Sequence, residues 1–138
     1  MRKNKMIYAL ISILGIALII IIMMLSNPLR RSVERIRDDM LKLTPIGTNM
    51  EDVIAIIESN EKWKINYISE SGGYLLIHGL PYQHFINSTT GTMIGEKSIK
   101  ASLGHYNILF HVYVTVYFGF DENSKLIDIA VSKNWDVI

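Results

Sequence analysis

The feature that most constrains this chain is an uncharged, strongly apolar stretch at residues 6–25. At about 1.5 Å per residue, a helix of about 20 residues covers roughly 30 Å, which is the hydrocarbon thickness of a bilayer. A cleavable signal peptide also begins with positive charge, but its apolar region is only about 7–15 residues long and ends at a small-residue cleavage site. This stretch is longer and is followed by Ser-Asn-Pro. The sequence therefore predicts an uncleaved transmembrane helix over 6–25, preceded by a basic tail over 1–5.

Basic residues lie on both sides of this helix, and basic residues mark the cytoplasmic side of a membrane. Arg2, Lys3 and Lys5 precede the helix, and four arginines follow it within residues 30–37. The later arginines alternate with acidic residues in a helical pattern, so they also fit the solvated face of a helix. We expect the N-terminus to lie inside and the domain to be extracytoplasmic, with the reverse orientation as the alternative.

Charge and cysteine content narrow the function classes. The chain has no cysteine, which argues against a lipid-modified cysteine, disulfides and cysteine-bound metal. Of 14 basic and 13 acidic residues, three basic ones lie in the tail, which leaves 11 basic against 13 acidic residues beyond it. That balance does not fit a nucleic-acid-binding domain. The predicted partners are the lipid bilayer, through residues 6–25, and a protein.

An amphipathic helix is expected to follow the membrane segment, within a tether at 26–43. Ser26 or Asn27 suits an N-cap and Pro28 suits the first helical position. Apolar residues then recur at three- and four-residue steps, the spacing of one helix face. They are Leu29, Val33, Ile36, Met40 and Leu43.

A second helix is predicted from Met50 to about Asn60. Thr48 and Glu51 have the spacing of a capping box, in which each side chain bonds the other residue's backbone N–H. The apolar face of this helix consists of Met50, Val53, Ile54 and Ile57. Two short helices of this kind need a sheet to bury their apolar faces.

Alternation of apolar and polar residues predicts that sheet, because side chains on a strand point alternately to its two faces. The expected strands cover 63–67, 98–103, 110–120 and 126–133, and the turn residues 121–124 join the last two into an antiparallel hairpin. Even-numbered residues from Phe110 to Phe120 should face the helices, together with Ile127, Ile129 and Val131. The glycine-rich region 69–96 contains one possible strand at 74–78, and its length suits either functional loops or extra strands.

The predicted fold class is thus α+β. An N-terminal transmembrane helix precedes two short helices that pack on one face of a roughly four-stranded antiparallel sheet, and the globular domain covers 44–138.

Two segments carry a resemblance to a known superfamily. Residues 46–53, Ile-Gly-Thr-Asn-Met-Glu-Asp-Val, resemble the "G-x-s/t-x-e-e-V" helix start of the β-lactamase-inhibitor-protein-like and SmpA/OmlA superfamily. Residues 118–128 are similar to its closing hairpin, so the likeness covers roughly 44–133. It implies a small, non-catalytic envelope or secreted module that binds proteins through a sheet face or neighbouring loops. Members are generally lipid-anchored through a cysteine or carry disulfides, so only the protein-binding scaffold carries over to this cysteine-free chain.

The polar residues lack the spacings of common catalytic and metal-binding motifs. His78, His84, His105 and His111 have neither the H-E-x-x-H spacing nor that of a short zinc hairpin. Phosphate-binding glycine loops and a G-x-S-x-G nucleophile turn do not occur. We expect no enzyme, no cofactor and no metal site.

One polar face of the expected sheet is suited to binding a protein partner. If the even-numbered residues of 110–120 face the helices, a polar set faces away and forms an uncovered surface. This candidate protein-binding face consists of His111, Tyr113, Thr115, Tyr117, Lys100 and Asp128. Tyrosine is favoured in protein interfaces, although cross-strand tyrosines also stabilise sheets without binding anything.

These patterns favour a non-catalytic, membrane-anchored, extracytoplasmic protein-interaction module that uses the sheet face or the 69–96 region. One alternative is a structural or immunity-type subunit that acts through its transmembrane helix. Another is a metal-dependent hydrolase that uses the histidines.

Overall fold

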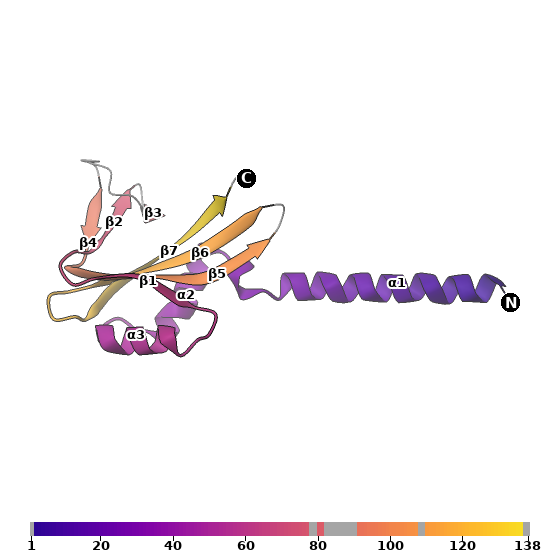
Figure 1. Cartoon of the computed structure of the whole chain (residues 1–138), viewed down its shortest axis with the longest axis horizontal. Helices are drawn as coiled ribbons and strands as arrows, with labels where there is room; N and C mark the ends of the chain where they lie inside the picture. The colour runs from indigo at the N-terminus through magenta and orange to yellow at the C-terminus, as the bar shows by residue number, and fades with distance from the viewer. Residues whose placement is uncertain (1, 78–79, 82–90, 108–109, 137–138) are drawn as a thin grey trace.

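An N-terminal helix extends away from a small α+β domain in the computed structural model, which describes residues 2–77, 80–81, 91–107 and 110–136 (Figure 1). The helix, α1, covers Arg2–Leu25. Its segment Met6–Met23 is long and apolar enough to cross a membrane, and none of that segment is buried against the domain. The predicted apolar helix is therefore present.

The connection between α1 and the domain contains a separate helical turn. Asn27 caps the 3₁₀ helix η1 (Pro28–Arg30), and its side-chain oxygen accepts a 3.0 Å bond from the Leu29 N–H. The chain is then extended at Arg31, and Ser32 caps α2 (Val33–Leu43). The prediction of one helix starting at Pro28 is therefore wrong, because a second capping residue restarts the helix at Val33.

The apolar face predicted for residues 29–43 packs against the core as expected, except at the C-terminal end of α2. Ile36 and Met40 are buried, and Leu29 and Val33 pack against the core at its margin. Leu43, expected inside, is exposed. Thr44 is buried in its place, because it ends the helix and donates its hydroxyl to the Met40 carbonyl at 2.9 Å.

Helix α3 (Met50–Glu58) forms where the sequence predicts it, but without the capping box. Met50, Val53 and Ile57 are buried as expected. Asn49 is the N-cap and makes no side-chain cap bond, and the Thr48 hydroxyl donates to the Pro45 carbonyl at 2.6 Å. The capping box fails because the residues before α3 pair with the start of the last strand: Leu126 N–H donates to the Thr48 carbonyl at 2.8 Å.

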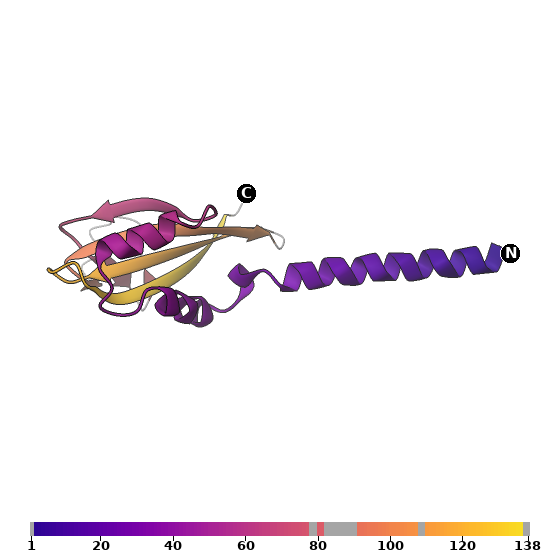
Figure 2. The same cartoon turned by 90° about the horizontal axis from the view of Figure 1, so that it is seen from below.

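The main sheet has four antiparallel strands in the order β1-β5-β6-β7. Their bounds are β1 (Lys64–Ser69), β5 (Lys97–Asn107), β6 (His111–Phe120) and β7 (Leu126–Asp136). Helices α2 and α3 lie on one face, and the core forms between them and the sheet (Figures 1 and 2). The α+β fold with helices on one face of a four-stranded antiparallel sheet is confirmed.

The even-numbered residues of β6 form the centre of this core. Val112, Val114, Val116, Phe118 and Phe120 are completely buried. Phe110, which was expected to share that face, is 46% exposed because β6 begins only at His111.

Irregularities in strand pairing shift the predicted alternation, two of them at β1–β5 and β6–β7. The β6–β7 register shifts at Gly119/Phe120, so Leu126 is buried and Ile127, expected inside, is exposed. The β1–β5 register shifts between Ile65 and Tyr67, which leaves Tyr67 exposed. A bulge places an extra residue on one strand and reverses the faces beyond it.

A second, three-stranded sheet lies over the other face of the main sheet (Figure 1). It has the order β3-β2-β4, with β2 (Tyr74–Ile77), β3 (Leu80–Pro81) and β4 (Thr92–Ile94). The possible strand at 74–78 is thus present up to Ile77, while His78 lies outside the described residues. Of the two alternatives for 69–96, extra strands are correct for the part of this region that the structure describes.

Candidate functional site

The outer face of the main sheet, opposite the helices, is divided into a covered half and an open half. The covered half lies toward the β6–β7 turn, where Tyr117 is 4% exposed and Thr115 is 6% exposed. The prediction that these two residues are uncovered is wrong. The second sheet covers this half of the face, with the Tyr74 ring of β2 centred 5.8 Å from the Tyr117 ring.

Asp128, another predicted member of the face, holds the two sheets together. Its Oδ2 accepts a 2.8 Å bond from the Tyr74 hydroxyl, and its Oδ1 accepts a 2.8 Å bond from Arg37 Nη2. The Nε of Arg37 also donates to the Ile129 carbonyl at 2.7 Å. Burial raises the pKa of the Tyr74 hydroxyl, and the Asp128 carboxylate raises it further. These bonds give Asp128 a structural role in joining the second sheet, the main sheet and α2.

Lys100 lies at the border of the covered half. Its Nζ is 5.7 Å from the centre of the Tyr117 ring, within the range of a cation–π interaction. Burial lowers the pKa of the Lys100 ammonium group. The side chain therefore packs along the sheet and only part of it reaches solvent.

The open half lies toward α1 and contains three rings, which we call the proximal ring cluster: His105, His111 and Tyr113. The ring of His105 lies 5.7 Å from that of His111 and 5.5 Å from that of Tyr113. Tyr113 is 39% exposed, His105 is exposed and His111 is half-buried. Of the six predicted face residues, His111 and Tyr113 therefore lie together on open surface.

His105 was not among the predicted face residues, because simple alternation along β5 places it on the core side. The β5–β6 register shifts between Ser102 and Gly104, and Gly104 has a φ of 115°. This bulge turns His105 outward, opposite Tyr113. The glycine is the one signal in the sequence that marks the position of the bulge.

Two of the four histidines, His105 and His111, lie in the part of the chain that the structure describes. No group of three or more histidine, cysteine or acidic residues that could hold a metal occurs there. His78 and His84 lie outside the described residues.

Cationic side chains collect where the sheet meets α1. Arg30 Nη2 donates to the Asn107 carbonyl at 2.7 Å, and its guanidinium lies 5.6 Å from the centre of the Tyr106 ring. Lys133 Nζ lies 5.2 Å from the same ring and donates to the Arg31 carbonyl at 2.6 Å. Tyr106 is thus in contact with two cations.

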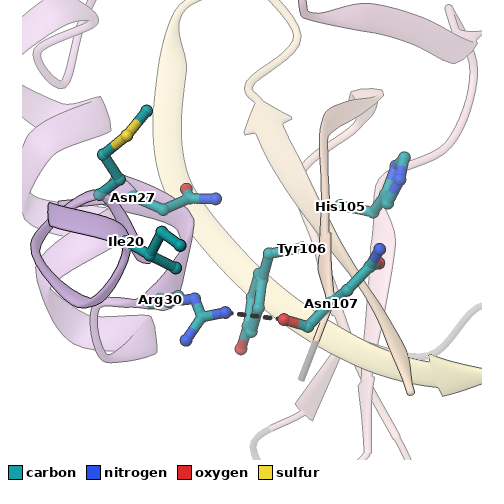
Figure 3. A pocket seen from close by; sticks show the side chains of 7 residues that line it. Ile20, Asn27, Arg30, His105, Tyr106 and Asn107 are labelled. Atoms are coloured by element: carbon teal, nitrogen blue, oxygen red, sulfur yellow. Dashed lines mark hydrogen bonds between the residues drawn. The ribbon is translucent and has the colours of Figure 1, made fainter. Parts of the chain in front are cut away.

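An open pocket of about 470 Å³ lies beside Arg30, between the last turns of α1 and the end of β5 (Figure 3). Its α1 wall is apolar and consists of Ile20 and Met23. Its other walls are mainly polar and aromatic: Asn27, Arg30, His105, Tyr106 and Asn107. We call this the junction pocket.

Comparisons with protein-family models, with curated proteins and with solved structures find no match to this chain. The resemblance of residues 44–133 to the β-lactamase-inhibitor-protein-like and SmpA/OmlA superfamily therefore stays a prediction.

Proposed function

We propose that this chain is a non-catalytic, single-pass membrane-anchored module that binds a protein partner outside the cytoplasm through the open half of its outer sheet face. The proximal ring cluster is the observation that carries the proposal. It places three contacting rings on open surface, next to a half of the same face that the second sheet already covers.

The cluster has the properties of a protein-binding surface. Aromatic side chains present large contact areas with few rotatable bonds, and they are enriched where binding energy concentrates. The rings stand on β5 and β6, whose opposite face is the packed core. Because the backbone beneath them is already ordered, binding would cost little conformational entropy.

Membrane attachment rests on α1. The segment Met6–Met23 has the length and hydropathy of a spanning helix, and its side chains have no domain surface covering them. The basic residues of the tail support an N-terminus on the cytoplasmic side. The domain would then lie on the outer side of the membrane.

A photo-crosslinking amino acid at position 113 tests the binding surface in native membranes. We expect a discrete crosslinked protein from position 113 and none from position 67. Tyr67 is the matched control, because it is an exposed tyrosine of the same sheet but lies on β1. Equal products from both positions, or none from position 113, would contradict the proposed surface.

Orientation is tested with single cysteines, which are unique thiols because the natural chain has no cysteine. Glu122→Cys places a thiol on the exposed turn of the β6–β7 hairpin, and Asn4→Cys places one in the tail. In intact cells a membrane-impermeant maleimide should label Glu122→Cys alone, and Asn4→Cys should react only after permeabilisation. The opposite pattern would place the domain in the cytoplasm.

A further inference from the structure

We infer that the junction pocket binds an anionic phospholipid of the bilayer, with the lipid phosphate held by the guanidinium of Arg30. This inference rests on the membrane anchoring proposed above and not on the proposed protein partner, although His105 belongs both to the pocket lining and to the proximal ring cluster.

The position of the pocket sets its environment. Ile20 and Met23 line it and belong to the segment Met6–Met23 that is apolar enough to span a membrane. Asn27 and Arg30 line it from just beyond that segment, within about two helical turns of Met23 along the chain. If α1 spans the bilayer, the pocket therefore lies where the hydrocarbon layer meets the lipid headgroups.

The walls of the pocket match the two parts of a phospholipid. Ile20 and Met23 offer an apolar surface to the first part of an acyl chain. Asn27, Arg30 and Asn107 offer polar side chains on the domain side, and Figure 3 shows Arg30 beside Tyr106 with its bond to Asn107. An apolar wall next to a cationic one suits a lipid better than it suits a soluble anion.

Arg30 is held in place before any ligand arrives. Its Nη2 is bonded to the Asn107 carbonyl, and its guanidinium stacks near the Tyr106 ring. Its Nε is buried and has no hydrogen-bond partner among the described residues. The Nη atoms of a guanidinium fixed in this way keep further N–H donors for phosphate oxygens, which arginine binds in a forked geometry.

The same end of the domain has other features of a membrane-facing surface. Trp135, near the end of β7, is 60% exposed, and Phe110, just before β6, is also exposed. Tryptophan is enriched at membrane–water interfaces. Lys133 also lies at this end, and its Nζ donates to the Arg31 carbonyl next to Arg30.

The test uses the full chain in nanodiscs made of equal amounts of palmitoyl-oleoyl phosphatidylglycerol and phosphatidylcholine. Lipid that stays bound after release of the disc is counted by native mass spectrometry. We expect the natural chain to retain phosphatidylglycerol in excess, and Arg30→Gln to lower that retention about tenfold, as expected for loss of a charge-assisted bond. Arg35→Gln is the matched control, because it removes the same charge from an exposed arginine of α2 outside the pocket.

Two further variants test the same inference if Arg30→Gln does not fold. Asn107→Asp adds a negative charge beside the proposed phosphate position and should lower phosphatidylglycerol retention as well. Arg30→Lys keeps the charge but loses the forked geometry and should retain an intermediate amount. Thermal unfolding of each variant in the same discs identifies any that is misfolded.

Each remaining outcome has a distinct meaning. A chain that does not elute with the discs overturns the proposed anchoring and this inference together. A chain that elutes with the discs but retains both lipids equally, or loses phosphatidylglycerol equally with Arg35→Gln, overturns this inference alone. Displacement of the lipid by excess inorganic phosphate would identify a general phosphate site and would overturn the assignment to a lipid.

Discussion

The hydroxyl of Tyr74 donates a 2.8 Å hydrogen bond to the carboxylate of Asp128, 54 residues later in the chain. Arg37 of α2 donates to the other oxygen of the same carboxylate at 2.8 Å. One side chain of β7 thus connects the second sheet, the main sheet and a helix of the opposite layer. The second sheet is thereby joined to the main sheet over the half of the outer face that contains Tyr117.

Tyr74→Phe should lower the free energy of unfolding by about 1–2 kcal/mol, because it removes a bond to a charged acceptor without removing the ring. The measurement is urea unfolding of the full chain in detergent micelles. Tyr67→Phe removes the same group from an exposed tyrosine and should change stability by less than about 0.5 kcal/mol. Equal effects of the two substitutions would show that the Tyr74–Asp128 bond contributes nothing measurable.

The same pair predicts a loss of stability in alkali. The pKa of Tyr74 is raised in the folded chain, by burial first and then by Asp128, above the ordinary value of 10.0. Below that value Tyr74 is neutral in both states and its contribution is complete. Above it, the unfolded chain loses the proton that the folded chain keeps, so stability falls as pH rises. Unfolding measured from about pH 9 to pH 11 should show a steeper fall for the natural chain than for Tyr74→Phe; parallel curves would contradict this.

Two adjacent glycines should respond differently to alanine. A Cβ at Gly73 would lie 2.0 Å from the Ile94 carbonyl oxygen, whereas a Cβ at Gly72 would meet only the Ser69 hydroxyl at 3.4 Å. Gly73→Ala must therefore push β2 and β4 apart, and Gly72→Ala need not. Hydrogen exchange of the β2 amides should become at least about tenfold faster in Gly73→Ala only, because opening of a local unit follows its own stability. Similar exchange in both variants would contradict this packing.

Two phenylalanines of the same sequence pattern should differ in their contribution to stability. Phe118→Ala removes a completely buried ring and should cost about 3–5 kcal/mol. Phe110→Ala removes a ring that is 46% exposed and should cost less than about 1 kcal/mol. Thermal or urea unfolding of both variants checks the difference, and a large loss from Phe110→Ala would place that ring in the core.

Replacing α1 with an unrelated transmembrane helix separates the proposed function from a subunit that acts within the membrane. The replacement should keep the crosslinked product from position 113, because the proximal ring cluster lies entirely on β5 and β6. Loss of the product, with the replaced chain still in the membrane, would favour the alternative in which the helix itself is the active part.

The sequence predicts those parts of the fold that depend on local patterns of apolar residues. The even-numbered face of β6 and the inner faces of α2 and α3 are recognisable because burial repeats with the period of the element. The antiparallel β6–β7 hairpin is recognisable from the polar turn between its strands.

The differences arise where contacts between distant residues decide the structure. Thr48 lacks its capping role because its backbone pairs with Leu126, and Ile127 is exposed because of a bulge across from Gly119. Tyr117 is covered because Tyr74 lies over it, and nothing within residues 110–120 indicates this. The sequence therefore predicts His111 and Tyr113 on the open face but not the covering of Thr115 and Tyr117. His105 joins this face only through the bulge at Gly104.

The direction of the main strands sets how far the domain extends from the membrane. In Figures 1 and 2, the antiparallel strands β5 and β6 extend between the end of the domain next to α1 and its far end, roughly along the line of α1. A strand of 10 residues, as β6 is, covers about 33 Å. If α1 stands upright in a bilayer, the domain acts as a fixed spacer of that height. The rings of His105, His111 and Tyr113 then remain within the first layer above the lipid, where they meet partners that are themselves held in the membrane.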